Sequence, residues 1–230
     1  MKKHIVAIGG GGFGRGNSSY LIEKYILDLS GKTTPKICFL PTATGDNDSY
    51  IVRFYSIFNR LNCKPSHIEF FKRTPNIKNH IKDQDVVFVG GGNTKSMLAI
   101  WKDWGMGEVL KDAYNEGVIM SGVSAGAICW FTSGVTDSWE NELRILPCLD
   151  FICGTCCPHY DEEPSRIPYV KKIIFDEKVT NCISIEGGSA MHFIDGVPYK
   201  NVSFKNNKNT YNVFLDKNDI VEKPFDKIQL

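Results

Sequence analysis

The chain has 230 residues, of which 42% are hydrophobic and 23% are charged, and its formal net charge at pH 7 is +1. This length suffices for one large core, so we expect a single domain over residues 1–230. The near-neutral charge gives no electrostatic reason to expect a nucleic acid or an anionic membrane as a partner. No apolar run approaches the roughly 20 residues that span a bilayer, and no signal peptide precedes the first strand, so we expect a cytoplasmic protein.

Short apolar runs alternate with amphipathic segments along most of the chain. The apolar runs predict buried strands at 4–9, 36–41, 67–71, 85–90, 117–122 and 182–186. Apolar residues at i, i+3 and i+4 predict helices within 18–30, 49–62, 94–105 and 106–117. Continuous apolar strands are typical of a mostly parallel sheet with helices on both faces, which is an α/β fold. The segment 190–216 instead alternates and contains "DG" and "NN" turn signals, so it predicts antiparallel strands near the C-terminus.

The first strand runs into "GGGGFGRG", in which Gly9, Gly11 and Gly14 satisfy the dinucleotide fingerprint G-x-G-x-x-G. A dinucleotide site also needs an acidic residue after the second strand, to bind the ribose. The second strand ends in "CFLPTAT", with Pro41 and Thr42 at that place. We therefore interpret Gly9–Gly16 as a wall of a substrate cleft or a tight loop.

Eight cysteines are spread over predicted core segments, which favours buried thiols in a reducing compartment over a disulfide scaffold. Cys153 and Cys156, followed by Cys157, formally contain the spacing C-x-x-C. A zinc site needs a second pair, which the sequence lacks, and a redox motif should open a helix. The sequence therefore predicts no metal site.

The stretch "VIMSGVSAGAICWF" carries the most chemical information. A buried strand turns at Gly122-Val123-Ser124-Ala125-Gly126 into an apolar helix, which matches the nucleophile elbow G-x-S-x-G. The glycines allow the sharp turn that projects the serine hydroxyl. The turn also places the Ala125 N–H at a helix N-terminus, where it can bind an oxyanion. We therefore expect Ser124 to be a nucleophile.

A serine nucleophile needs a base and a carboxylate that orients the base. Among the five histidines we select His159, in "CCPHYDEEPSR", because it follows a strand at the expected carboxyl edge of the sheet. Asp137 fits the usual order serine, acid, histidine along the chain. Glu140, Glu142 and Asp161 remain alternatives for the acid.

A second glycine-rich turn, "FVGGGNTKSML", follows the strand at 85–90. Gly91 and Gly92 lack side chains, so a substrate carbonyl can approach their backbone N–H groups, which would supply a second oxyanion donor. Asn93 can line the same site or cap the following helix, and both roles are compatible.

The motifs "GGGNT", "GVSAGA", the downstream "TD" and "PHYD" together resemble the peptidase E (aspartyl dipeptidase) family of serine peptidases, whose relatives include cyanophycinase. The resemblance extends from the first strand to about Arg166. It implies a flavodoxin-like fold akin to class I glutamine amidotransferases, with serine at the elbow. It also implies hydrolysis of short peptides through an acyl-enzyme, with no cofactor.

Carried over to this chain, the resemblance makes Ser124 the nucleophile, His159 the base and Asp137 the acid. Gly91, Gly92 and Ala125 would form the oxyanion hole. Arg166 is the candidate cation for an N-terminal aspartate, because guanidinium binds carboxylate bidentately. We expect a short-peptide substrate and a monomer or homodimer. The competing interpretation is an inactive or amidotransferase-like binding module on the same scaffold.

Overall fold

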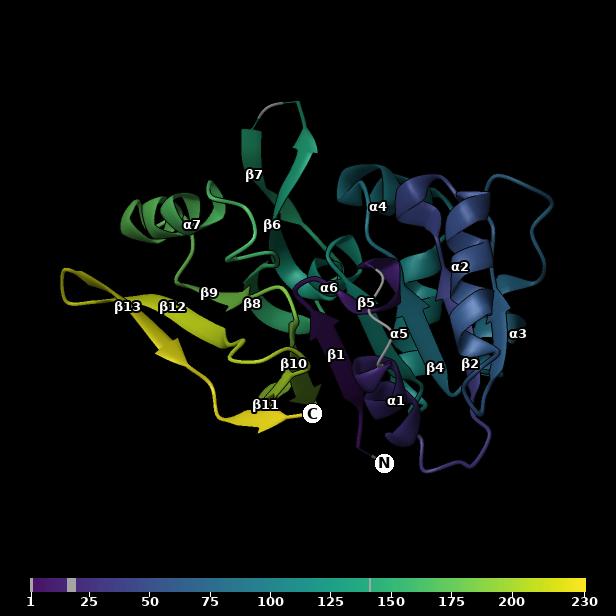
Figure 1. Cartoon of the computed structure of the whole chain (residues 1–230). Coiled ribbons are helices and arrows are strands. Elements are labelled where there is room, and N and C mark those ends of the chain that lie inside the picture. Colours follow the sequence, from purple (N-terminus) through teal and green to yellow (C-terminus); the bar gives the residue numbers. More distant parts are fainter. Residues whose placement is uncertain (1, 16–19, 141) are drawn as a thin grey trace.

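The computed structural model describes residues 2–15, 20–140 and 142–230, and an eight-stranded sheet forms its centre (Figure 1). The strand order is β14-β11-β10-β1-β5-β4-β2-β3. The parallel strands are β1 (His4–Ile8), β5 (Ile119–Val123), β4 (Val86–Val89), β2 (Lys36–Leu40) and β3 (Lys64–His67). The sheet continues through β10 (Ser189–Ile194), antiparallel to β1, and through β11 (Val197–Ser203) and β14 (Lys227–Gln229). The prediction of a parallel core with antiparallel strands near the C-terminus is confirmed.

Helices cover both faces of the parallel strands because successive strand residues point to opposite sides. Val6 and Ile8 of β1 join the core beneath α1 (Leu21–Asp28) and α2 (Asp48–Phe58). Ile5 and Ala7 join the core beneath the helices on the other face. Those helices are α3 (Ile77–Lys82), α4 (Thr94–Asp103) and α5 (Met106–Asn115). Two 3₁₀ helices, η1 (Gly12–Arg15) and η2 (Thr42–Thr44), follow β1 and β2.

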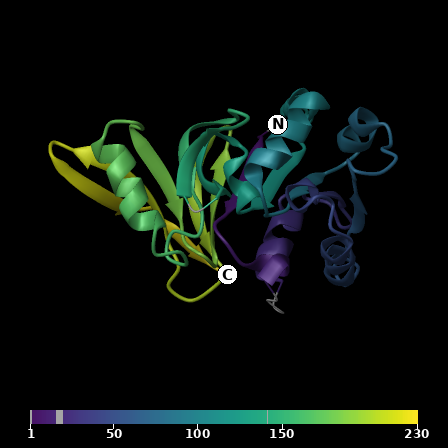
Figure 2. The same ribbon diagram turned by 90° about the horizontal axis from the view of Figure 1, so that it is seen from above.

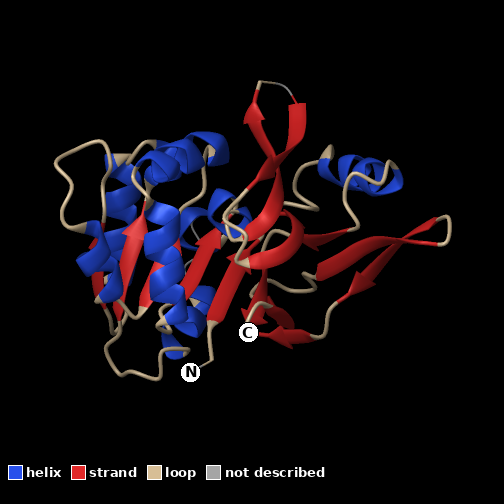
Figure 3. Cartoon of the chain, turned by 180° about the vertical axis from the view of Figure 1, so that it is seen from behind, coloured by secondary structure: helices blue, strands red, loops and turns tan. Residues whose placement is uncertain are grey.

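A second, six-stranded sheet lies beside the first and was not predicted (Figure 3). Its order is β13-β12-β9-β8-β6-β7. The bounds are β6 (Phe131–Trp139), β7 (Glu142–Pro147), β8 (Ile152–Cys157), β9 (Asn181–Ile185), β12 (Thr210–Asp216) and β13 (Asp219–Pro224). The helix α7 (Arg166–Phe175) buries Val170, Ile173 and Ile174 against this sheet. The predicted strand at 182–186 thus exists, as β9, but in the second sheet.

Two further predictions differ from the structure in detail. The strand expected at 67–71 is β3 (Lys64–His67), which ends earlier. It ends because the N–H groups of Phe70 and Phe71 donate to the buried carboxylate of Asp46 rather than to a neighbouring strand. The apolar helix expected after the elbow is the short α6 (Ala125–Ile128), and the chain then enters β6.

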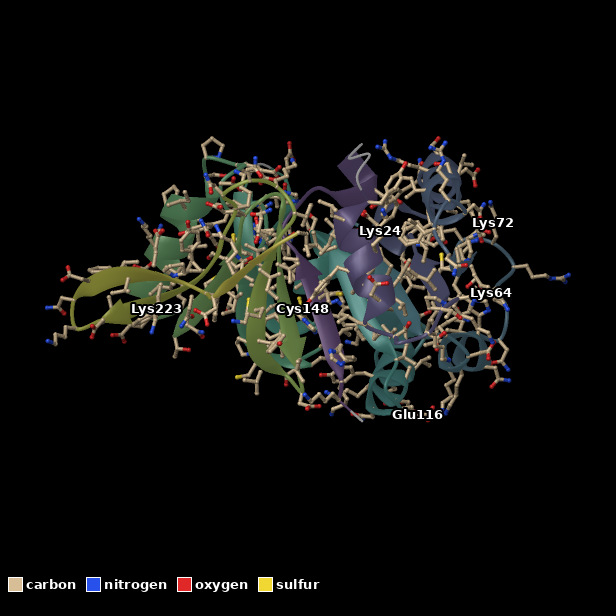
Figure 4. All side chains as sticks on the ribbon, turned by 60° about the horizontal axis from the view of Figure 1, so that its bottom comes forward. Lys24, Lys64, Lys72, Glu116, Cys148 and Lys223 are labelled. Carbon is tan, nitrogen blue, oxygen red and sulfur yellow. The ribbon has the colours of Figure 1, made fainter. Side chains whose placement is uncertain are left out.

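The second sheet with α7 occupies one end of the molecule, and α2 and α3 occupy the other (Figure 2). Charged side chains point outward at both ends, such as Lys64 and Lys72 at one end and Lys223 at the other (Figure 4). Among the described residues, no helix is both long and apolar enough to cross a membrane.

Candidate active site

Ser124 stands at the turn between β5 and α6 in a strained backbone conformation. Its φ is 58° and its ψ is −111°, and its N–H donates to the carbonyl of Ile8 at 3.0 Å. Side-chain-bearing residues rarely adopt this region, which costs about 1–3 kcal/mol. A Cβ on Gly122 would clash with the carbonyl of Gly126, and a Cβ on Gly126 would clash with the carbonyl of Val89. Both glycines are therefore required for β4, β5 and α6 to meet closely.

His159 lies two residues after β8, at the same edge of the fold as Ser124. Its N–H donates to the carbonyl of Gly9 at 3.0 Å, its φ is 51°, and it is buried. Its Nδ1 lies 2.5 Å from Oε2 of Glu162, three residues further along the chain. An Nδ1–H bonded to a carboxylate leaves Nε2, on the opposite side of the ring, in the basic form.

Glycines on two loops make room for the pair formed by His159 and Glu162. A Cβ on Gly10 would lie 2.5 Å from Oε2 of Glu162 and 2.7 Å from Nδ1 of His159. A Cβ on Gly187, in the turn between β9 and β10, would overlap the carboxyl carbon of Glu162. Gly10 of the glycine-rich loop after β1 therefore allows His159 and Glu162 to approach the backbone closely. The predicted loop extends to Gly16, which lies outside the described residues.

Asp161 holds the second of these loops in place. Its Oδ1 accepts a hydrogen bond from the N–H of Gly187 at 2.7 Å, and its Oδ2 pairs with Nζ of Lys208. The hydrogen bonds and the charge of Lys208 lower the pKa of this carboxyl, although its partial burial acts in the opposite direction. Asp161 is thus engaged in supporting the loop rather than facing His159.

The remaining candidates for the acid lie on the hairpin of β6 and β7. Asp137 is 67% exposed, and its Oδ1 lies 3.7 Å from Nη2 of Arg166. Glu142 pairs with Arg144. Glu140 is exposed near the tip of the hairpin. The carboxylate on His159 therefore differs from the predicted one, because β6 carries Asp137 away toward α7 while Glu162 lies in the same turn as the histidine.

Sequence reasoning missed Glu162 for an identifiable reason. The chain order serine, acid, histidine favours Asp137, and Asp161 is the alternative in "DEEPSR", so neither pattern points to Glu162 in the same segment. The spacing of three residues between His159 and Glu162 was the available signal, since a turn brings such side chains together. The Glu162 N–H donates to the His159 carbonyl at 3.1 Å, which closes that turn.

Ser124 and His159 line one pocket of about 180 Å³. Its other described lining residues are Gly11, Tyr50, Gly91, Gly92 and Val123. A Cβ on Gly91 would lie only 3.2 Å from Cβ of Ser124, so the backbone of Gly91 is adjacent to Ser124. Gly92 has a φ of 140°, and a Cβ there would clash with the carbonyl of Ala43.

Asn93 and Arg166 have structural partners. The side-chain oxygen of Asn93 caps α4 by accepting from the N–H of Ser96 at 2.9 Å, and its nitrogen donates to the carbonyl of Ser138 at 3.2 Å. Arg166 is only 3% exposed. Its guanidinium donates to Glu163 at 2.6 Å and to the carbonyl of Val135 at 3.2 Å, so it joins α7 to β6.

Most of the cysteine side chains are buried, and Cys153 is exposed. All eight are free thiols. Burial raises the pKa of Cys157 and of Cys148 to about 12, so these thiols stay protonated at neutral pH. Within the part of the chain that the structure describes, no group of three or more metal-ligating side chains comes together.

Comparison with known proteins agrees with this geometry. The model of peptidase family S51 matches residues 5–197. The chain therefore belongs to peptidase family S51, a class of serine peptidases, and the resemblance to the peptidase E family is confirmed.

Particular relatives share both sequence and fold. The chain is 41% identical over 223 residues to the uncharacterized peptidase YgaJ of Bacillus subtilis (strain 168), with 96% of each chain covered. A crystal structure of a candidate peptidase E protein from Listeria monocytogenes EGD-e has a TM-score of 0.61 and 15% identity, covering 98% of this chain and 100% of that one. A peptidase from an acI-B1 actinobacterium has a TM-score of 0.67 and 15% identity, covering 99% and 95%. The two structures support the α/β fold.

Proposed function

We propose that this peptidase hydrolyses short peptides, in the manner of a dipeptidase, through an acyl-enzyme on Ser124. His159 is the general base and Glu162 is the orienting acid. The observation that carries the proposal is one small pocket lined by both the strained elbow serine and a histidine whose Nδ1 is bonded to a carboxylate.

In the first half of the reaction, Oγ of Ser124 forms a bond to the carbonyl carbon of the substrate. Its proton passes to Nε2 of His159, and the carbonyl π electrons move onto oxygen to give a tetrahedral oxyanion. Collapse of this species breaks the C–N bond, and His159 gives its proton to the departing amine. The acyl group remains on Ser124.

In the second half, water attacks the ester carbonyl while its proton passes to His159. Collapse then breaks the bond between carbon and Oγ, the proton returns to Ser124, and the peptide fragment leaves as a carboxylic acid. The negative charge of Glu162 stabilises the imidazolium that forms in each half.

Backbone N–H groups are the proposed donors to the oxyanion. The N–H of Ala125 opens α6, where a helix leaves its first N–H groups without intrahelical partners. The second proposed donor is the N–H of Gly91 in the loop after β4, where a Cβ would lie 3.2 Å from Cβ and 3.8 Å from Oγ of Ser124. Removing a donor of this kind typically costs about 3 kcal/mol of transition-state stabilisation.

The volume of the pocket suits a small group of a short substrate, because sites for drug-sized ligands hold about 300–1,000 Å³. Selection of an N-terminal aspartate by Arg166 forms no part of this proposal. Its guanidinium already contacts Glu163, the carbonyl of Val135 and Asp137, so it is neutralised and engaged.

The test uses a fluorophosphonate probe and a series of dipeptides with varied first residues. We expect the probe to label the wild-type chain at Ser124, and we expect Ser124→Ala to lose both labelling and turnover while keeping its melting temperature. Labelling sites are read by peptide mass spectrometry. A wild-type chain that neither labels nor cleaves any dipeptide would instead be a binding module on the same scaffold, and full turnover by Ser124→Ala would contradict the mechanism.

A further inference from the structure

We propose that the hydroxyl of Tyr50 is a side-chain donor of the oxyanion hole, a catalytic role that rests on the proposed peptidase mechanism. Tyr50 comes from the first turn of α2, far from the elbow in sequence, yet it lines the same pocket as Ser124 and His159. Among the described residues that line this pocket, Tyr50 is the one with a phenolic hydroxyl.

The position of the hydroxyl is defined by Gly91. The Gly91 N–H donates to the Tyr50 oxygen at 3.4 Å, and the same glycine backbone approaches Ser124 closely. A phenol can accept one hydrogen bond and donate another at the same time. An oxyanion that also accepts from the Gly91 N–H would share that proton with the Tyr50 oxygen in a three-centre hydrogen bond, which would place it next to the Tyr50 hydroxyl.

The ring of Tyr50 is held firmly, as a preorganised donor must be. It stacks on Phe13 at a centroid distance of 5.5 Å and an interplanar angle of 26°, and it meets Phe39 edge-on at 5.0 Å and 85°. A Cβ on Gly90 would lie 2.8 Å from Cε1 of Tyr50. The triple glycine after β4 thus serves two purposes, because Gly90 admits the tyrosine ring and Gly91 admits the substrate.

The N-cap of α2 fixes the position of Tyr50 along the helix. The side-chain oxygen of Asn47 accepts from the N–H of Tyr50 at 3.1 Å, so Tyr50 stands in the first turn of the helix. Tyr55 lies further along the same helix, and its hydroxyl bonds to Nδ1 of His67 at 2.7 Å. Tyr55 does not line the pocket among the described residues, which makes it a matched control.

The experiment compares Tyr50→Phe with Tyr55→Phe, since each loses one hydroxyl from α2 and keeps its ring. The readout is the rate constant for phosphonylation of Ser124 by the fluorophosphonate, in which the bond between Oγ and phosphorus forms, fluoride leaves and the proton passes to His159. The phosphonyl oxygen occupies the place of the oxyanion. We expect Tyr50→Phe to lower this rate constant and kcat by about 100-fold, the lower end of the range of about 10²–10³ in kcat that a side-chain oxyanion donor contributes. KM and the melting temperature should change little.

Tyr55→Phe is expected to react within about twofold of the wild type, since its hydroxyl is remote from the developing charge. Equal rates for Tyr50→Phe and the wild type would overturn the inference while leaving the peptidase mechanism intact. Equal losses in both variants would also overturn it, because they would show a general effect of α2. A wild-type chain that is not labelled at all would overturn the mechanism and the inference together.

Discussion

At the residue scale, the proposed mechanism depends on the carboxylate that is bonded to His159. Glu162 meets Nδ1 at 2.5 Å, whereas Asp137 is exposed and faces Arg166 at 3.7 Å. An orienting acid fixes the tautomer of the base and stabilises the imidazolium. These functions need a negative charge at Nδ1, and the geometry provides it from Glu162.

Glu162→Gln is therefore expected to lower kcat by roughly 10²–10⁴-fold, by analogy with the loss seen when an orienting carboxylate becomes an amide. Asp137→Asn is the matched control, and it should retain kcat within about twofold because exposed ion pairs contribute only about 0–1 kcal/mol. Steady-state kinetics on the best dipeptide of the series measures both. The reverse order of effects, with Asp137→Asn the more damaged, would show that the resting geometry is not the catalytic one.

At the scale of the element, the elbow depends on glycines at which an added Cβ would strike backbone atoms rather than side chains. A Cβ on Gly126 would strike the carbonyl of Val89 in β4, and carbonyl groups in a parallel sheet cannot move aside. Gly107 is a different case in α5, where a Cβ would lie 3.3 Å from the end of the flexible Leu149 side chain. We therefore expect that Gly126 does not tolerate a side chain and that Gly107 does.

Gly126→Ala should destabilise the fold by more than about 3 kcal/mol, or prevent folding, since overpacking against a rigid neighbour typically costs 1–3 kcal/mol or more. Gly107→Ala should be neutral or stabilise by up to about 1 kcal/mol, because alanine has a higher helix propensity than glycine and Gly107 lies in the first turn of α5. Urea unfolding midpoints at constant m-value measure the difference. Similar midpoints for the two variants would mean that β4 and α6 separate without cost.

On the scale of the whole molecule, a buried histidine joins three elements. His192 in β10 is 1% exposed, and its Nε2 lies 2.9 Å from Nδ1 of His4 in β1. Its Nδ1 lies 2.8 Å from the hydroxyl of Tyr25 in α1. Burial, with a smaller contribution from His4, lowers the pKa of His192 to about 4.

Acid is therefore expected to destabilise the protein before its carboxylates titrate. Between pH 6.5 and about 4 the unfolded chain binds a proton at residue 192 that the folded chain does not bind, so the free energy of unfolding falls as pH falls through this window. His192→Asn should remove part of that slope, although burial also lowers the pKa of His4 and leaves some of it. Urea titrations at several pH values between 4 and 7 measure the slope, and an unchanged slope in His192→Asn would assign it to other groups.

The parallel core and its helices were predictable because their signals are local. Strands such as β1 and β4 are buried on both faces and so consist of continuous apolar runs, and each covering helix shows its own buried stripe. The second sheet was not predictable in this way. Its strand β7 is half-exposed and mixes charged with apolar residues, and the buried face of α7 begins with the charged Arg166, which weakens its apolar stripe.

In the candidate site, too, some residues were predictable from local sequence signals and one was not. Ser124 is marked by a motif that a strand-to-turn-to-helix geometry demands, and His159 by its place after a strand. The partner of His159 is decided by where three loops meet, and Gly10 and Gly187 are far apart in the chain. The three-residue spacing of His159 and Glu162 is a local signal, but short-range patterns do not relate that turn to the two distant glycine loops that admit it.

The approach of the Gly10 and Gly187 loops to His159 and Glu162 has a consequence during synthesis of the protein. A chain still growing on the ribosome already contains Ser124, His159 and Glu162 before Gly187 has been added. It lacks the turn that covers the Glu162 carboxylate and the three strands of the central sheet that follow β9, which are β10, β11 and β14. We expect such an unfinished chain not to hydrolyse peptides. Peptidase activity would then appear only after the last strands have been synthesised and have folded.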